Sequence, residues 1–125
     1  VYNGYGFDHN IRVIRYSDIL LMYAEALVQG ATVPLTCGLS ADNAVNMVRN
    51  RAGLPSISGA TLQDIWDERR AELAMEEDRY FDLVRTNQAA TALASKGFVV
   101  GKHEHYPIPA AQMQLNPNLT QNNGY

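Results

Sequence analysis

The sequence contains 125 residues, of which 46% are hydrophobic and 18% are charged. These values are ordinary for a globular domain and exclude a disordered chain. The formal net charge of −3 gives no electrostatic reason to propose nucleic acid as a partner. The one cysteine, Cys37, excludes an internal disulfide, and no apolar run reaches the roughly 18 residues that a membrane-spanning helix needs.

Residues 1–15 combine glycines with aromatic residues, which predicts irregular structure and at most a brief extended piece near 11–14. Tyr2, Tyr5 and Phe7 are the candidate ligand-binding residues, because together they could form a stacking surface for a planar or sugar ligand. The alternative is a loop whose aromatic side chains pack against the body of the domain.

Residues 18–29 predict a helix that Ser17 caps and Gly30 ends. The helix is apolar almost all round, so we expect it to be central in the fold. Glu25 is its one charge past the first turn, which makes Glu25 the first candidate partner for Arg69 or another arginine. The alternative places Glu25 on an exposed edge.

Residues 31–39 contain a proline and a glycine, and they predict a connection. Ser40 then caps a second helix, which runs to about residue 51 and ends before Gly53 and Pro55. The apolar stripe of this helix consists of Ala44, Val45 and Val48.

The organising stretch of the chain is 61–85, where Thr61 is the N-cap of an amphipathic helix. Asp64 stands at the capping-box position, where Glu or Gln is preferred. On a helical wheel, one face carries Arg69 and Glu76 together with four apolar residues, which are Leu62, Ile65, Trp66 and Leu73. Because a buried charge persists only when it is paired, we expect Arg69 and Glu76 to have ionic partners on a neighbouring helix.

A bend is expected at Asp78, after which residues 79–85 form a second amphipathic piece. In that piece we expect Tyr80, Phe81 and Val84 to pack inward.

Residues 87–95 favour a short helix that Gly97 ends, and 98–100 favour a short extended segment. The tail, 106–125, contains three prolines and many asparagines. It therefore predicts ordered turns across the domain surface, with one short helical turn near 110–115.

Chemistry-bearing patterns are weak in this sequence. His103 and His105 could bind a metal from alternate positions of a strand, but a third ligand is missing, and exposed loop histidines are the alternative. Glu68, Glu72 and Glu76 recur every four residues without the Glu-x-x-His motif of a di-metal site, and neighbouring arginines make them poor general acids. No nucleophile elbow, phosphate loop or dinucleotide fingerprint is present. We therefore predict no catalytic residue, no metal site and no cofactor.

Four segments occur in one order: IRVIRYSDILLMYAEALVQG, VRNRAGLP, ERRAELAMEEDRYFDLVRT and YPIPAAQMQLNPNLTQNNGY. Together they resemble the C-terminal region of the SusD/RagB family of nutrient-binding outer-membrane lipoproteins, over roughly residues 11–125. One departure is visible, since the family usually has glycine at the position that aligns with Glu77 or Asp78. Because members of the family are several times longer and this chain opens at Val1, we expect residues 1–125 to be a single SusD/RagB-like C-terminal domain and a fragment of a longer chain.

The resemblance implies a mainly α fold of antiparallel, tetratricopeptide-like helix pairs with long ordered loops and an irregular C-terminal tail. It implies a non-catalytic protein that binds a glycan or other nutrient at the bacterial cell surface and delivers it to a SusC-like TonB-dependent transporter. The expected partners also include the N-terminal remainder of its own chain, and no nucleic acid. The implied location is the outer membrane, with a lipid anchor on an N-terminal cysteine absent from this chain, and Cys37 is not that cysteine.

The motifs that carry the resemblance are scaffold motifs, so they assign no ligand residues. We interpret the charged residues as a structural ionic network, formed by Glu25, Arg69, Arg70, Glu72, Glu76, Arg79, Asp82 and Arg85. Two alternatives stay open, a helical protein-interaction domain without ligand binding of its own and a glycan-processing enzyme.

Overall fold

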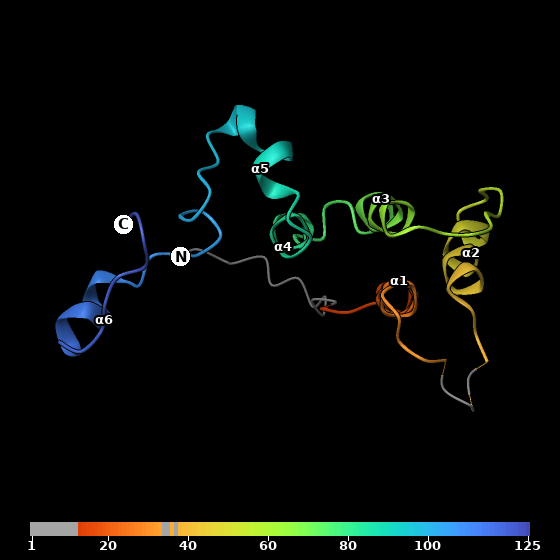
Figure 1. Ribbon diagram of the computed structural model, residues 1–125, viewed down its shortest axis with the longest axis horizontal. Coiled ribbons are helices and arrows are strands. Elements are labelled where there is room, and N and C mark those ends of the chain that lie inside the picture. Colours follow the sequence, from red (N-terminus) through yellow and green to blue (C-terminus); the bar gives the residue numbers. More distant parts are fainter. Residues whose placement is uncertain (1–12, 34–35, 37) are drawn as a thin grey trace, which may run out of the picture. The chain divides into compact units, whose positions relative to one another are not determined.

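Every regular element in the described part of the computed structural model is helical. The structure describes residues 13–33, 36 and 38–125, and Figure 1 shows these residues as helices joined by loops. The elements are α1 (Tyr16–Val28), α2 (Ala41–Arg51), α3 (Leu62–Glu72), α4 (Arg79–Arg85), α5 (Ala89–Ala92), the 3-10 helix η1 (Ala94–Lys96) and α6 (Ala110–Leu115). No strand occurs in the described residues, so the predicted mainly α fold class is confirmed, whereas 98–100 do not form the expected extended segment.

The chain divides into two compact units, Val1–Ala74 and Met75–Tyr125. We refer to them as the first unit and the second unit, and each is described by itself. The first unit contains α1, α2 and α3, and the second contains the shorter helices α4, α5, η1 and α6. The single domain expected over residues 1–125 stays a prediction.

The core of the first unit lies between its three helices, because α1 packs against both α2 and α3. Apolar residues spaced three or four positions apart share one face of a helix, and here those faces meet. The buried cluster consists of Leu20, Leu21, Ala24, Ala44, Val45, Val48 and Ile65. The apolar stripe predicted for α2 is therefore confirmed. By contrast, α1 buries only one face, since Ile19 and Met22 are exposed.

The helix starts in the first unit are set by local side-chain chemistry. Ser40 caps α2 by accepting the backbone N–H of Asn43 at 3.2 Å. Thr61 and Asp64 form a complete capping box at the start of α3, so the shorter carboxylate of aspartate suffices there. The predicted cap of α1 is wrong, because that helix begins at Tyr16 and its N-cap residue, Arg15, makes no side-chain capping bond.

Two polar residues of α2 hold the loop that leads into α3. Asn46 pairs with Ile57, donating to its carbonyl and accepting its backbone N–H, both at 2.8 Å. Asp42 accepts the backbone N–H groups of Gly59 and Ala60, and these two bonds lower the pKa of the Asp42 carboxyl. These bonds fix the loop that enters α3 against α2.

The helix α3 ends earlier than its sequence pattern predicts. Leu73 is its C-cap, and Met75 and Glu77 adopt left-handed backbone conformations with φ of 70° and 69°. Those conformations cannot continue an α-helix. The prediction that Glu76 lies in the apolar stripe of this helix is therefore wrong, since Glu76 is exposed beyond the helix end.

The second unit has short helices and few buried apolar residues. Leu83 and Ala89 are its buried hydrophobic residues in the described chain. In α4, Leu83 and Asp82 face inward, whereas Phe81 is 57% exposed, which corrects the inward position expected for Phe81. Gly97 adopts a left-handed φ of 81° directly after η1, as a C-terminal stop requires.

Hydrogen bonds from side chains hold the C-terminal tail of the second unit. Gln121 pairs with Ile108, accepting its N–H at 2.8 Å and donating to its carbonyl at 2.9 Å. Asn122 donates to the Tyr106 carbonyl at 2.6 Å. The short helix expected near 110–115 is confirmed as α6. This tail is ordered through polar pairing, and hydrophobic burial contributes little to it.

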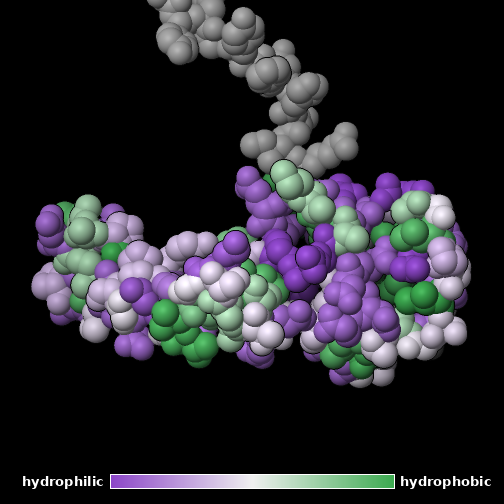
Figure 2. Space-filling view, turned by 90° about the horizontal axis from the view of Figure 1, so that it is seen from above, coloured by the Kyte–Doolittle hydropathy of each residue, from purple (hydrophilic) through white to green (hydrophobic). Residues whose placement is uncertain are grey.

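On the face that Figure 2 shows, hydrophobic and hydrophilic residues are interspersed. Single exposed apolar side chains are normal for a protein surface. Among the described residues, no helix has both the length and the apolar composition needed to cross a membrane.

Candidate functional site

A buried ion pair links α3 to α1. Arg69, in the last turn of α3, donates through Nη1 to Oδ1 of Asp18 at 2.6 Å. The Arg69 side chain is 6% exposed. A buried charge of this kind is stable only with such a partner, because removal of one member leaves the other uncompensated. The arginine on the apolar face of α3 thus has an ionic partner on a neighbouring helix.

Glu25 lies on the same buried face of α1 as Asp18, two helical turns further on. Its Oε1 accepts the indole N–H of Trp66 at 3.1 Å and the side-chain amide of Gln29 at 3.2 Å. The expected burial of Glu25 is confirmed. The indole donor also explains how a tryptophan lies half-buried on α3 with its polar atom satisfied.

Glu72, the last residue of α3, links the other two helices of the first unit. It accepts from Nη1 of Arg15 at 2.8 Å and from Nη2 of Arg51 at 2.5 Å. Burial of the Glu72 carboxyl raises its pKa, but hydrogen bonds from Arg15, Ser17 and Arg51 outweigh burial and hold the pKa below its ordinary value. The carboxylate therefore stays ionised and joins the start of α1 to the end of α2.

Sequence reasoning missed five members of this framework: Glu68, Asp18, Arg15, Arg51 and Arg49. The last of these donates from α2 to Oε2 of Glu68 at 2.7 Å. A signal was present, because Arg49 and Arg51 follow the apolar stripe of α2 while Glu68 and Glu72 are four residues apart on α3. Two arginines on one helix and two carboxylates on the next predict cross-helix pairs.

The other residues expected in the ionic network do not link the helices of the first unit. Arg85 donates to Asp82 at 2.7 Å, within α4 of the second unit. Arg70 and Arg79 have no ion-pair partner among the residues that the structure describes. For Arg70 the reason is geometric, since it lies 100° around α3 from Arg69 and is exposed.

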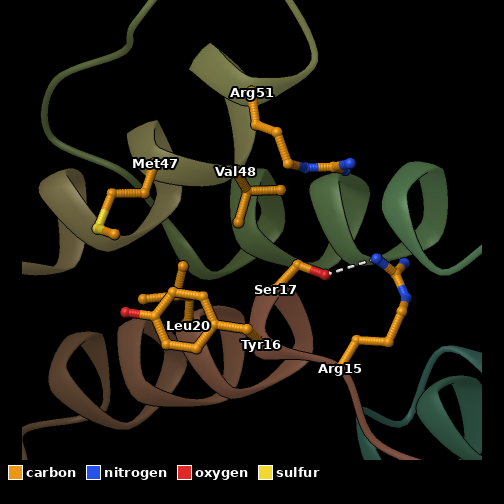
Figure 3. A pocket seen from close by; sticks show the side chains of 7 residues that line it. All are labelled: Arg15, Tyr16, Ser17, Leu20, Met47, Val48 and Arg51. Carbon is orange, nitrogen blue, oxygen red and sulfur yellow. Dashed lines mark hydrogen bonds between the residues drawn. The ribbon is translucent and has the colours of Figure 1, made fainter. Parts of the chain in front are cut away.

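A cavity of about 310 Å³ lies between α1 and α2. Figure 3 shows the side chains that line it, which are Arg15, Tyr16, Ser17, Leu20, Met47, Val48 and Arg51. Both arginines already bind Glu72. The lining is otherwise largely apolar, and among the described residues that form it the exposed ring of Tyr16 is the one aromatic group.

The second unit contains a cavity of about 400 Å³ with a different lining. Aromatic rings predominate in it, with a few polar side chains, and the lining consists of Tyr80, Leu93, Lys96, Gly97, Phe98, His103, His105, Tyr106 and Tyr125. The rings of Tyr80 and Tyr106 lie 6.3 Å apart at 52°, and Lys102 Nζ lies 4.7 Å from the centre of the Tyr125 ring. Tyr106 is 66% exposed and Tyr125 is 47% exposed. We name this the aromatic cavity.

Hydrogen bonds fix the orientation of two groups in the aromatic cavity. Nδ1 of His103 accepts the backbone N–H of Val99 at 2.8 Å, so the neutral ring carries its proton on Nε2. The Tyr80 hydroxyl donates to the His103 carbonyl. Burial raises the pKa of Tyr80, and the neighbouring Tyr106 and Tyr125 raise it further, so this donor stays protonated at neutral pH.

The described residues contain no group of three or more side chains placed to hold a metal ion. The histidines that sequence reasoning considered as metal ligands, His103 and His105, line the aromatic cavity. The predicted ligand residues Tyr2, Tyr5 and Phe7 lie outside the described residues, so their role stays a prediction.

The fold and the paired charges of the first unit define a helical scaffold in which ionic groups are used internally. Comparison with known proteins identifies the family to which this scaffold belongs. The model of the SusD family matches residues 1–100, so the chain belongs to the SusD family. This family consists of non-catalytic binding proteins, and the prediction that the chain is not an enzyme is therefore confirmed.

Relatives and solved structures agree with this assignment. SusD-like protein P38 of Formosa agariphila is 34% identical, over 94% of this chain and 25% of its own length. The starch-binding protein SusD of Bacteroides thetaiotaomicron is 28% identical, over 94% of this chain and 22% of its own.

Two solved structures resemble this chain closely. The structure of a laminarin-binding SusD-like protein gives a TM-score of 0.78 at 44% identity, over 90% of this chain and 23% of that one. Surface glycan-binding protein A from Bacteroides uniformis gives a TM-score of 0.76 at 32% identity, over 93% of this chain and 28% of that one. The chain thus spans about a quarter of the length of these relatives.

Proposed function

We propose that the chain is part of a protein that captures a glycan at the bacterial cell surface and delivers it to a SusC-like TonB-dependent transporter of the outer membrane. The likeness to the laminarin-binding SusD-like protein, with a TM-score of 0.78 at 44% identity, carries this proposal. The names of two further relatives, a starch-binding protein and a surface glycan-binding protein, support the same ligand class. A lipid on a cysteine outside this chain would hold the protein at the membrane.

The arrangement of charges fits a binding role. Arg15, Arg51 and Arg69 are all committed to carboxylates of the same unit, so they stabilise the scaffold and leave ligand binding to other groups. A saccharide presents hydroxyl groups and apolar C–H faces, and tyrosine rings with adjacent hydrogen-bond donors match both. In the described residues that combination occurs in the second unit.

Isothermal titration calorimetry of the chain tests glycan capture. The probes are laminari-oligosaccharides, which are β-1,3-glucans, and malto-oligosaccharides, which are α-1,4-glucans, followed by a wider glycan array. We expect saturable binding of at least one glycan. Chromatography of the glycan after incubation should show that its chain length is unchanged. Absence of binding across the array would overturn glycan capture and favour the protein-interaction alternative, and shortened products would favour an enzyme.

Delivery to a transporter is tested separately. The protein is purified from detergent-solubilised outer membranes of its native host under mild conditions, and co-purifying proteins are identified by mass spectrometry. We expect a TonB-dependent transporter at a constant ratio to the protein. Purification of the protein with full glycan binding and without any such transporter would overturn the delivery step while leaving glycan capture in place.

A further inference from the structure

We propose that the aromatic cavity of the second unit is a saccharide subsite, in which one pyranose ring stacks on Tyr106. The inference rests on the proposed glycan capture and gives it a position within this chain. All the described residues that line the cavity belong to the second unit.

The aromatic groups provide the stacking surface. Tyr106 is 66% exposed, although Tyr80 lies beside it at 6.3 Å between ring centres. A tyrosine that lies beside another ring in a tilted arrangement and is still largely open to solvent has ring surface left for a ligand. The C–H face of a pyranose is apolar, and it gains from burial against such a ring.

Polar groups around the cavity provide donors for sugar hydroxyl groups. Because Nδ1 of His103 accepts from Val99, its Nε2–H remains a donor in the neutral ring. Lys96 adds an ammonium group with three donors, and His105 also lines the cavity. A mostly apolar wall with a few convergent polar groups is the usual composition of a small-molecule site, and about 400 Å³ lies in the usual size range.

The tail is also held in place around the cavity. The Tyr125 hydroxyl donates to the His105 carbonyl at 3.0 Å, and Asn122 donates to the carbonyl of Tyr106 at 2.6 Å. Lys102 covers part of the Tyr125 ring, which leaves Tyr106 as the more open platform. Fixing these residues before binding reduces the entropy lost when a ligand is bound.

The cavity between α1 and α2 is less suited to a saccharide. Its two arginines donate to Glu72, and Arg15 also donates to Ser17 at 2.8 Å, so part of their donor capacity is already used within the scaffold. Tyr16 is 68% exposed, nearly the same as Tyr106, and it is the one ring among the described residues that line this cavity. This similarity makes Tyr16 a matched control.

The test uses the chain and the glycan of highest affinity found by calorimetry. We expect Tyr106→Ala to weaken binding about tenfold or more, because an exposed stacking ring is lost. Tyr106→Phe, which keeps the ring, and Tyr16→Ala, which removes an equally exposed ring from the first unit, should each stay within about twofold of the unsubstituted chain. Thermal melting of all three variants checks that they are folded, and Tyr106 tolerates truncation because its side chain is mostly exposed.

The outcomes separate this inference from the proposed function. Unchanged affinity of a folded Tyr106→Ala variant, with glycan still bound, would overturn the subsite and leave glycan capture standing. A large loss in Tyr16→Ala alone would overturn the subsite and place the ligand at the α1–α2 cavity. If Tyr106→Phe lost as much glycan affinity as Tyr106→Ala, that result would also contradict the subsite, because stacking requires only the ring. Absence of any glycan binding by the unsubstituted chain would instead overturn the proposed function.

Discussion

The two units of this protein use their side chains in opposite ways. The first unit buries its apolar cluster and also its charges, with Asp18, Glu25, Glu68 and Arg69 all below one tenth exposed. The second unit buries little, holds its tail by side-chain hydrogen bonds, and exposes tyrosines around a cavity. Groups that satisfy one another inside a fold cannot serve a ligand, whereas exposed rings with free donors can. We therefore assign a scaffold role to the first unit and a ligand-binding role to the second.

The largest expected effect concerns the charges of the scaffold. Arg69→Ala removes the buried partner of Asp18 and should lower the free energy of unfolding by about 3–5 kcal/mol. The matched control is Arg51→Ala, whose side chain is 62% exposed and whose loss should cost less than about 1 kcal/mol. Urea unfolding measures both. Equal losses would remove the distinction between buried and exposed ion pairs on which the scaffold role depends.

Core packing gives the next largest effect. Leu21 is fully buried between the helices of the first unit, and Leu21→Ala should cost about 2–5 kcal/mol. Leu115→Ala, at an exposed position of α6 in the second unit, should change stability by less than about 0.5 kcal/mol. The same urea series measures both. A comparable loss at Leu115 would show that the second unit depends on burial as much as the first does.

The pKa of Glu72 predicts how acid affects the scaffold. Its folded-state pKa lies below the ordinary value of 4.5, so the carboxylate stabilises the fold at neutral pH, and this contribution is lost as pH falls below 4.5 through the folded-state pKa. Glu72→Gln should therefore be less stable than the unsubstituted chain at pH 7, and the difference should shrink in acid. Thermal melts across this pH range provide the measurement. A difference that stays constant with pH would mean that the pairs with Arg15 and Arg51 contribute no charge-dependent stability.

The smallest expected effect is an increase in stability, whereas the preceding substitutions lower it. Glu77 lies at φ 69°, where an L-residue is strained and glycine is not. Glu77→Gly should therefore raise the free energy of unfolding by at most about 1 kcal/mol, because the gain is partly offset by the flexibility of glycine in the unfolded chain. Glu77→Ala keeps the Cβ atom and should show no gain. A glycine variant less stable than the alanine variant would contradict this account of the turn.

Sequence patterns predicted the parts of the fold that depend on near neighbours. Ser40, Thr61 and Gly97 end or begin helices through bonds that span three or four residues, and such signals are readable along the chain. The helical wheel placed Arg69 on the buried face because it, too, uses only the spacing of neighbouring residues in one helix. The partner could not be predicted, because Asp18 is 51 residues away and sequence alone does not tell which carboxylate a folded helix brings near.

Two features depend on the folded backbone and so were missed. The residues 73–78 continue a helical pattern, yet the chain turns there through Met75 and Glu77, which places Glu76 outside α3. Two hints of this turn were present: the bend expected at Asp78, directly before α4, and the glycine that the family usually has near Glu77. The aromatic cavity combines residues from α4, the η1 region and the last residue of the chain, and no local pattern links positions so far apart.

The claim that ligand binding belongs to the second unit is tested most directly by nuclear magnetic resonance. Amide spectra of the isotope-labelled chain are recorded during titration with the glycan selected by calorimetry. We predict that shifts concentrate at Tyr80, at residues 93–106 and at Tyr125, while the amides of α1 and α2 stay unchanged. Shifts that concentrate instead around Tyr16 and Met47 would contradict the division of roles between the two units.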